Sequence, residues 1–237
     1  MAPPFALKQR TTERHACPDG DVVFVGIGLP NLACNLARAT HAPNMTLIYE
    51  SGAVGAVPER VPPSIGKTAL VTGSLMVTSM SDIFQCFLQN GKIQIGFLGG
   101  AQVDKHGNIN TTAVGPYNAP KVRLPGSGGA CEIAQHAQRV LIVTKLDKRA
   151  FPEKVDFITS NGKRVKKVIT NMGILEPDDT GELTLTALYP GVTFEAVQEN
   201  IGWALKKAVR LSDVALPTLK EIELLRTKLD PKRQHIK

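Results

Sequence analysis

An acidic residue and a glycine-rich loop are the groups in this sequence whose types and spacing best suit chemistry. The loop is Gly26-Ile27-Gly28, and it follows the β-branched and aromatic run Val22–Val25. The acidic residue, Glu50, follows a second apolar run, Thr46–Tyr49. Both runs are typical of buried strands. Because ligands bind beyond the carboxyl ends of the strands in an open α/β sheet, Glu50 and the loop are predicted to face one site.

Two kinds of chemistry fit this arrangement. The first is dinucleotide binding, because the spacing from the loop to Glu50 is close to the ~20 residues that separate the glycines from a ribose-binding carboxylate. Against it, Asn31 occupies the third glycine position and Pro30 interrupts the loop. The second is nucleophilic attack by Glu50 on an activated acyl group, which forms an anhydride. A surface carboxylate or a structural ion pair stays open for Glu50 taken alone.

Two further glycine loops favour the acyl chemistry. Gly99-Gly100 ends the apolar run Ile93–Leu98, and Gly126–Gly129 precedes a helical pattern. Backbone N–H groups in such loops can stabilise the oxygen that gains negative charge during acyl transfer. Glycine also leaves room for a phosphate group or a pantetheine chain to approach the main chain.

The elements that must position these residues follow from apolar spacing and capping signals. Asn31 is predicted to cap the helix after the first loop, and Ser81 to cap a helix that runs to Asn90 and is closed by Gly91. Residues 51–67 are expected to be irregular, because they hold several glycines and prolines. Further strands are predicted at 140–144, 168–171 and 183–189, and helices at 194–199 and 216–229. The prediction is a single α/β domain over 1–237 with an open, mostly parallel sheet flanked by helices, after a poorly patterned segment at 1–20.

Composition narrows the possible classes of protein. The 237 residues are 43% hydrophobic and 21% charged, which is the balance of a globular protein in water. No stretch approaches the ~20 apolar residues of a membrane span, and the N-terminal residues do not resemble a signal peptide. Four widely spaced cysteines predict reduced, buried thiols and argue against a zinc site or disulfides, which weakly indicates a cytoplasmic protein.

The charge balance is basic, with a net charge of +7 and a pI of about 9.3. Aromatic residues make up only 5% of the chain, and no nucleic-acid recognition motif is present, so nucleic acid is not an expected partner. The basic clusters Lys145–Arg149, Lys163–Lys167 and 230–237 are interpreted as solvated faces. A polyanionic small molecule is the alternative partner for them.

Four motifs resemble the β subunit of the family I coenzyme A transferases, most of all the glutaconate CoA-transferase type. They are VGIGLP at 25–30, YESG at 49–52, GGAQVDKHGNIN at 99–110 and GSGGA at 126–130. The resemblance covers residues from about 20 to 230, with the motifs in the family's order. The 3-oxoacid members usually carry Glu-Asn-Gly where this chain has Glu50-Ser51-Gly52, which favours the glutaconate-like branch.

The resemblance implies a role for each motif. Glu50 would be the nucleophile, and Gly26, Ile27 and Gly28 would form an oxyanion hole. The residues expected to line the coenzyme A and substrate path are Ser51, Gly52, Gly99, Gly100, Ala101, Gly126, Ser127, Gly128, Gly129 and Ala130.

It also implies a ping-pong reaction through a glutamyl-CoA thioester, with coenzyme A entering as an acyl-CoA and with no metal and no permanently bound cofactor. The acids exchanged would be carboxylic acids, dicarboxylic or 3-oxo. An α subunit is the expected partner, in an α2β2 heterotetramer. Two alternatives stay open: an acyl-CoA hydrolase or ring-opening enzyme of the same fold, and a non-catalytic nucleotide-binding subunit.

Several other residues carry weaker signals. Arg60 and Arg123 could bind the second carboxylate of a dicarboxylic substrate, or could form structural ion pairs. His106 is interpreted as a turn histidine in preference to a catalytic base. Asn108 and Asn110 are expected to hold the same turn. Two aromatic residues, Tyr189 and Trp203, are expected in the core or in an interface.

Overall fold

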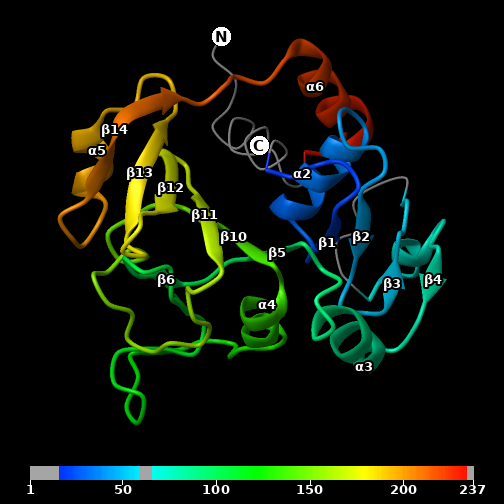
Figure 1. Ribbon diagram of the computed structural model, residues 1–237, viewed down its shortest axis with the longest axis horizontal. Helices are drawn as coiled ribbons and strands as arrows, with labels where there is room; N and C mark the ends of the chain where they lie inside the picture. Colours follow the sequence, from blue (N-terminus) through cyan, green and yellow to red (C-terminus); the bar gives the residue numbers. More distant parts are fainter. Residues whose placement is uncertain (1–15, 59–65, 234–237) are drawn as a thin grey trace. The chain divides into compact units, whose positions relative to one another are not determined.

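The computed structural model describes residues 16–58 and 66–233 (Figure 1). Its backbone contacts divide the chain into two compact units. The first contains the residues up to Phe97 together with those from Ala215 onward, and the second is Leu98–Val214. The first unit therefore combines the two ends of the described chain, and it also carries Glu50.

The first unit is built on five strands whose central members are parallel. Their order across the sheet is β5 (Ile95–Leu98), β1 (Val22–Phe24), β2 (Thr46–Ile48), β3 (Ala53–Val54) and β4 (Met76–Val77). Strand β1 pairs in parallel with both β2 and β5, whereas β3 and β4 continue the sheet antiparallel. Val23, Leu47 and Ile95 are fully buried, as expected for apolar strands covered on both faces.

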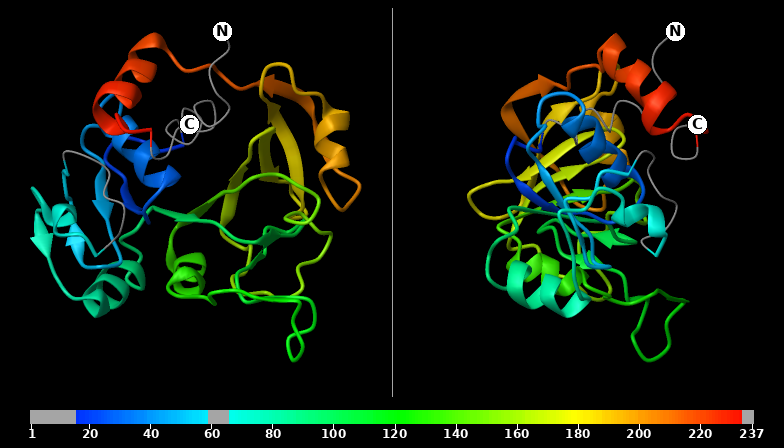
Figure 2. Two further views of the ribbon diagram at one scale, coloured as in Figure 1. Left: turned by 180° about the vertical axis from the view of Figure 1, so that it is seen from behind. Right: turned by 90° about the vertical axis from the view of Figure 1, so that its right-hand side faces the viewer.

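Helices from distant parts of the sequence pack together in this unit. Helix α2 (Leu29–Arg38) follows β1, and helix α6 (Leu219–Leu224) continues into the π-helical turn η3 (Leu225–Leu229) near the C-terminus. Leu32 and Leu36 of α2 form a buried cluster with Leu225 of η3. The ribbons of α2 and of the helical segment near the C-terminus lie side by side (Figure 1, Figure 2). The remaining helical segments are η1 (Thr68–Val71), α3 (Met80–Asp82) and the π-helical η2 (Ile83–Leu88).

The second unit has a mixed five-stranded sheet and two small hairpins. The sheet order is β14 (Lys206–Asp213), β13 (Leu183–Leu188), β12 (Gly173–Pro177), β11 (Val165–Ile169) and β10 (Arg139–Val143). The pairs β10–β11 and β13–β14 are parallel, and the other two pairs are antiparallel. The hairpins are β6 (Gln102–Val103) with β7 (Ile109–Asn110), and β8 (Ala113–Val114) with β9 (Val122–Arg123). Two helices, α4 (Ala130–His136) and α5 (Phe194–Glu199), complete the unit.

The aromatic residues expected in the core lie in the second unit. Trp203 is only 6% exposed and packs near the ring of Phe151, with 6.4 Å between the ring centroids. Tyr189 is buried with Ile174 and Val214. Both aromatic predictions are therefore confirmed as far as the core is concerned.

The predicted α/β class is confirmed, with parallel central strands and flanking helices, and the bounds of α5 match the prediction. The extent of a single domain over 1–237 stays a prediction, and residues 1–15 of the poorly patterned segment lie outside the described residues. In the part of the chain that the structure describes, no helix is long and apolar enough to cross a membrane.

Three local predictions are wrong. Asn31 does not cap α2, because the helix begins two residues earlier with Gly28 as its N-cap and Pro30 in its first turn, where proline is tolerated. Ser79, not Ser81, caps α3, and its hydroxyl accepts a hydrogen bond from the Asp82 N–H. The segment after Glu50 is not wholly irregular, since β3 pairs with β2. Strands β12 and β14 were not predicted.

Candidate active site

Glu50 lies at the tip of a tight turn between β2 and β3. The Tyr49 N–H donates to the Ala53 carbonyl at 2.9 Å, and the Gly52 N–H donates to the Tyr49 carbonyl at 3.0 Å. These bonds close the hairpin and leave Glu50 and Ser51 at its end. Glu50 is half-buried, and no described residue forms a hydrogen bond or an ion pair with its carboxylate. The structural ion pair that the sequence left open for Glu50 is therefore absent among the described residues.

Gly52 is required by the geometry of this turn. Its φ of +104° is disfavoured for residues with a side chain, and a Cβ at this position would clash with the Thr78 carbonyl oxygen. The Thr78 N–H donates to the Gly52 carbonyl at 3.0 Å. Thr78, the residue after β4, is therefore in direct contact with the turn that carries Glu50.

Thr78 is itself fixed by the start of α3. Its hydroxyl donates a short hydrogen bond to the Asp82 carboxylate, which also accepts from the Ser79 N–H. The Thr78 hydroxyl, followed by the Ser79 groups, holds the pKa of Asp82 below its usual range. Asp82 therefore stays ionised near neutral pH and supports Thr78 against the turn.

A buried polar cluster is built around Tyr49, the residue that precedes Glu50. Tyr49 is completely buried, and its hydroxyl donates to the Asn31 side-chain oxygen at 3.4 Å. The same oxygen accepts from the Asn35 amide at 2.6 Å. Burial raises the pKa of Tyr49 to about 12, so the hydroxyl stays neutral. The cluster links the turn of Glu50 to the first half of helix α2.

The loop Gly26-Ile27-Gly28 begins at the end of the strand next to β2. Phe24 is in register with Ile48, and the Val25 N–H donates to the Ile48 carbonyl at 3.0 Å. The loop and Glu50 therefore leave neighbouring parallel strands at the same edge, as predicted. Gly28 has a φ of +97° and caps α2 through its carbonyl.

The N–H groups of this loop are available as donors. No described residue accepts a hydrogen bond from the backbone N–H of Gly26, Ile27 or Gly28. A Cβ on Gly26 or Gly28 would meet no atom within 4 Å, and Ile27 is 38% exposed. The loop also precedes the N-terminus of α2, whose dipole favours negative charge. An oxyanion or another anionic group can therefore approach these donors.

The other predicted glycine loops belong to the second unit. A Cβ on Gly100 would clash with the Ile109 side chain, and the Ala101 N–H donates to the Asn110 carbonyl at 3.0 Å, so this segment is fixed by backbone packing. A Cβ added at Gly99 would lie 3.4 Å from the Val143 carbonyl oxygen. That these residues line a site with Glu50 stays a prediction.

The segment Gly126–Ala130 is a turn that opens α4. The Ser127 hydroxyl accepts from the Cys131 N–H at 3.2 Å, and the Ala130 N–H donates to the Ser127 carbonyl at 2.9 Å. Gly126 and Gly128 have positive φ values, and a Cβ on either would meet no atom within 4 Å. This open space is compatible with the predicted coenzyme A path, which stays a prediction for this segment as well.

The weaker candidates have structural partners. Arg123 donates to the Tyr117 carbonyl at 3.0 Å and its guanidinium lies 5.0 Å from the centre of the Tyr117 ring. His106 is an exposed turn histidine whose Nδ1 lies 3.3 Å from the Gly181 carbonyl oxygen. Asn108 holds the same turn by donating to Asp104 at 3.0 Å. Arg60 lies outside the described residues.

Asn110 and the cysteines complete the comparison with the sequence. Asn110 is fully buried and donates to Gln102 and to the Ala113 carbonyl, both at 2.7 Å, so its structural role is confirmed. Cys17 and Cys34 are buried as predicted, Cys131 is only half-buried, and Cys86 is exposed, so the prediction of buried thiols is wrong for Cys86. It lies on the open face of η2, where the helical pattern does not require an apolar contact.

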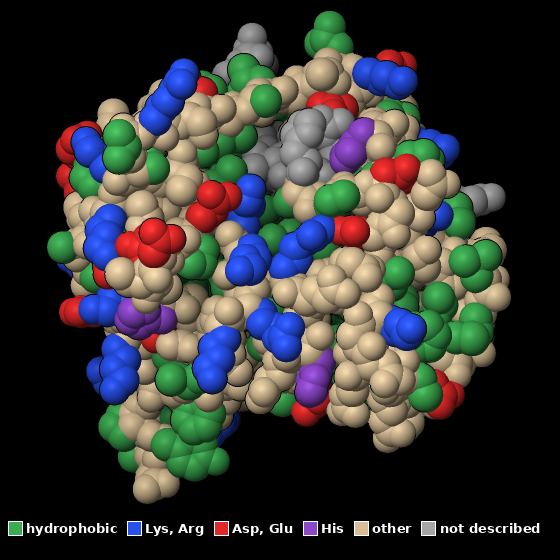
Figure 3. All heavy atoms as spheres, in the orientation of Figure 1, with side chains coloured by type: hydrophobic (Ala, Val, Ile, Leu, Met, Phe, Trp, Pro, Cys, Tyr) green, Lys and Arg blue, Asp and Glu red, His purple; other side chains and the backbone are tan. Residues whose placement is uncertain are grey.

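One lysine of the basic clusters of the second unit has an acidic partner. Lys167 forms an ion pair with Glu176 at 3.0 Å. Figure 3 shows lysine and arginine side chains exposed on the viewed face, some of them beside acidic side chains. Such an arrangement supports solvated faces for these clusters. Among the described residues, no group of three or more His, Cys, Asp or Glu is placed to hold a metal ion.

The sequence did not identify Tyr49, Asn31 and Thr78 as supports of the turn. Tyr49 carried no signal beyond its apolar run. Thr78 contacts Gly52 although more than 20 residues separate them in the sequence, because β3 pairs with β4. The glycines and prolines of this region gave no signal for that pairing. A polar residue at position 31 inside an apolar helix face was the one signal available, and it was interpreted as a cap.

The fold and the sequence together place the chain among the coenzyme A transferases. The sequence profile of the family described as Coenzyme A transferase matches residues 9–200, and the chain belongs to this family. Its relatives identify it more closely as a β subunit of a family I coenzyme A transferase.

Two curated relatives and two solved structures support this assignment. The chain is 48% identical over 224 residues to the B subunit of 3-oxoadipate CoA-transferase from Pseudomonas knackmussii, covering 88% of this chain and 86% of the relative. It is 34% identical over 246 residues to the B subunit of glutaconate CoA-transferase from Acidaminococcus fermentans, covering 94% and 91%. The crystal structure of glutaconate CoA-transferase from that organism superposes with a TM-score of 0.92 at 30% identity, covering 99% of this chain and 97% of the other. The decarboxylase AibA/AibB superposes with a TM-score of 0.90 at 26% identity, covering 98% and 97%.

Proposed function

We propose that this chain supplies the nucleophile of a CoA-transferase that moves coenzyme A from an acyl-CoA donor to a carboxylic acid through a covalent intermediate on Glu50. One observation carries the proposal. Glu50 lies at the tip of a closed turn, and its carboxylate has no described partner. The turn lies at the same edge of the sheet as the loop Gly26-Ile27-Gly28, whose backbone N–H groups donate to no described residue.

The reaction follows from these groups in two half-reactions. A carboxylate oxygen of Glu50 attacks the thioester carbonyl carbon, the C–S bond breaks, and CoA leaves as a thiolate with an acyl-glutamyl anhydride on the enzyme. The thiolate then attacks the glutamyl carbonyl carbon, and the donor acid leaves as its carboxylate. The product of this half-reaction is a glutamyl-CoA thioester.

An acceptor carboxylate reverses the two steps and leaves as its CoA ester, which regenerates the Glu50 carboxylate. No proton and no electron is gained or lost in the cycle. The N–H groups of Gly26, Ile27 and Gly28 would stabilise the negative charge on the carbonyl oxygen in each tetrahedral intermediate. The glycine loops at 99–101 and 126–130 would bind the coenzyme A chain.

The acceptor acid is proposed to be a 3-oxo dicarboxylic acid. The 48% identity to a relative named for 3-oxoadipate exceeds the 34% identity to the one named for glutaconate. The higher overall identity outweighs the Glu50-Ser51-Gly52 motif, from which the sequence alone favoured the glutaconate-like branch. Initial rates with 3-oxoadipate and with glutaconate as acceptors test this choice, and a higher rate with glutaconate would reverse it.

The partner would be an α subunit of a CoA-transferase, in a heterotetramer with two copies of each chain, in the cytoplasm. Relatives of this chain are named as B subunits, which supports a second chain. Coenzyme A would enter as a substrate, with no resident cofactor.

The decisive test is intact mass spectrometry of the purified complex after incubation with a panel of acyl-CoA esters and no acceptor acid. We expect this chain to gain the mass of one CoA less one water, as a thioester requires, located on the peptide that contains Glu50. An adduct on the partner chain would overturn the assignment of the nucleophile. Steady release of free CoA without an adduct would favour the hydrolase alternative.

The matched variants are Glu50→Gln and Glu223→Gln, the second of which changes an exposed glutamate of α6. Glu50→Gln should lose at least about 10³-fold in transfer rate, because no other group replaces a covalent nucleophile. Glu223→Gln should retain the rate of the unmodified complex. A loss of only a few-fold in Glu50→Gln would favour the non-catalytic nucleotide-binding alternative.

A further inference from the structure

A pocket lies at the opposite end of helix α2 from Glu50. Helix α2 starts at Leu29, beyond the carboxyl end of β1, and runs back along the sheet to Arg38, roughly 15 Å further on at 1.5 Å per residue. Strand β3 runs antiparallel to β2, so the residues that follow it, Val57 and Pro58, leave the sheet at the same far edge. The pocket is lined by Asn35, Arg38, Ala39, Pro43, Val57, Pro58, Lys228 and Leu229.

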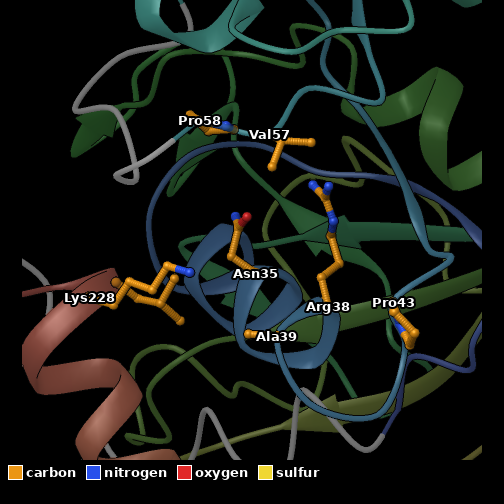
Figure 4. Close-up of a pocket in the computed structure, with 8 residues that line it drawn as sticks. Asn35, Arg38, Ala39, Pro43, Val57, Pro58 and Lys228 are labelled. Carbon is orange, nitrogen blue, oxygen red and sulfur yellow. The ribbon is translucent and has the colours of Figure 1, made fainter.

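The size and the walls of the pocket suit a small organic molecule. Its volume is about 340 Å³, within the range of roughly 300–1,000 Å³ that small-molecule sites occupy. Val57, Pro58 and Leu229 supply apolar walls. In Figure 4 the Asn35 side chain lies between those of Lys228 and Arg38, with Val57 and Pro58 across from them.

The charges in the pocket are all positive. Arg38 and Lys228 are its charged lining residues, and no described carboxylate lines it. Lys228 has no described ion-pair or hydrogen-bond partner. Arg38 donates from Nη1 to the Ala56 carbonyl at 2.7 Å, which fixes the guanidinium and leaves its other N–H donors for a ligand. The Asn35 amide nitrogen already donates to the Asn31 carbonyl and side-chain oxygens, so the cationic donors for a ligand come from Arg38 and Lys228.

The C-terminal end of α2 does not cancel this positive charge. The carbonyls of Asn35 and Ala37 accept hydrogen bonds from the Ala39 and His41 N–H groups, both at 3.0 Å. The Leu36 carbonyl accepts from the Thr40 hydroxyl at 2.7 Å. Carbonyls that are engaged in this way repel an approaching anion less than free ones do.

We propose that this pocket binds a small organic anion, with a carboxylate or phosphate group between Arg38 and Lys228 and an apolar segment against Val57, Pro58 and Leu229. The site is separate from Glu50 and does not depend on the transferase chemistry. Its position at the far edge of the sheet makes it suited to an effector and not to the reacting substrate.

Isothermal titration calorimetry on the full-length chain tests the proposal with three probes. Adipate offers two carboxylates on an apolar chain, inorganic phosphate offers the anion alone, and 1,6-diaminohexane has the same chain length with positive ends. We expect saturable binding of adipate and none of 1,6-diaminohexane. Tighter binding of phosphate than of adipate would support the site and identify a phosphate ester as the ligand. Absence of binding of both anions would overturn the proposal.

Three variants locate the binding. Lys228→Gln should weaken adipate binding by about tenfold, the value of one charge-assisted hydrogen bond, and Val57→Trp should weaken it by filling the pocket. Lys228 is exposed and unpaired among the described residues, so its loss should not disturb the fold. Lys220→Gln, which changes an exposed lysine of α6 that does not line the pocket, is the matched control.

Equal affinities in Lys228→Gln and Lys220→Gln would place adipate elsewhere and overturn the proposal. Glu50→Gln should bind adipate as tightly as the unmodified chain. A loss of adipate binding in that variant would assign the ligand to the turn of Glu50. Because these binding measurements need no turnover, their outcome does not depend on whether the transferase proposal is correct.

Discussion

Gly52 shows how a single residue shapes the turn of Glu50. Gly52→Ala should lower the free energy of unfolding by more than about 2 kcal/mol, because the new methyl group combines an unfavourable φ with a clash against the Thr78 carbonyl. Urea unfolding of the purified chain measures this loss.

Gly28 and Gly26 provide graded controls for Gly52. Gly28→Ala has the unfavourable φ but meets no atom within 4 Å, so it should cost about 1 kcal/mol. Gly26→Ala has neither problem and should stay within about 0.5 kcal/mol of the unmodified chain. Equal costs at all three positions would contradict the role given to Thr78.

Tyr49 predicts an alkaline loss of stability. The pKa of its hydroxyl is about 12 in the folded chain, against 10.0 for an ordinary tyrosine, because burial disfavours the phenolate. A raised folded pKa contributes stability that is fully present below pH 10 and is lost as the pH rises from 10 towards 12. The free energy of unfolding should therefore fall over this window.

Tyr49→Phe should remove that part of the pH dependence, which unfolding curves collected at several pH values measure. Tyr117→Phe is the control, because Tyr117 is 54% exposed and its hydroxyl has no described partner. An unchanged alkaline slope in Tyr49→Phe would show that the loss belongs to other groups, such as Lys206, whose pKa is raised by Glu182 and Asp178.

At the residue level, the sequence predicted where Glu50 and the loop at 26–28 lie but not the residues that support them. Glu50 and the loop at 26–28 each follow an apolar strand, and the carboxyl ends of strands in an open α/β sheet are where ligands bind. Asn31 could not be interpreted correctly, because its buried partners, Tyr49 and Asn35, become visible only when β2 and α2 are packed.

At the level of elements, α2 depends on a helical turn from the other end of the chain. Leu225→Ala should lower the free energy of unfolding by about 2–5 kcal/mol, because Leu225 is completely buried against Leu32 and Leu36. Hydrogen exchange should also show faster exchange of the α2 amides. Leu219→Ala removes a side chain that is 86% exposed on α6 and should have little effect. Similar exchange of α2 in both variants would contradict the packing of η3 on this helix.

The elements that the sequence missed share a physical cause. Strand β14 carries the charged and exposed pattern of Lys206–Asp213, so it lacks the alternation that predicts a strand, and its parallel pairing with β13 stabilises it. Strand β3 has two residues and is held by β2 and β4. In contrast, α5 has its own cap, Thr193, whose hydroxyl accepts from the Ala196 N–H, and its bounds could be predicted locally.

At the level of the whole molecule, composition and periodicity indicated the α/β class but not its division into two compact units. The first unit is discontinuous in sequence, because residues from Ala215 onward return to it after the whole of the second unit. A sequence pattern reports contacts between neighbours along the chain, whereas this return depends on the apolar cluster of α2 and η3. The position of Glu50 within the first unit therefore relies on contacts made by the last part of the described chain.

The chain has a single tryptophan, Trp203, and it is buried in the second unit. Tryptophan emission excited at the red edge of the indole absorption will therefore report on the surroundings of Trp203 in the second unit. It will not report directly on the first unit, which holds Glu50. A titration that changes the absorbance of Tyr49 without changing this emission would report an event confined to the first unit. The protein thus contains a natural optical label for one of its two units.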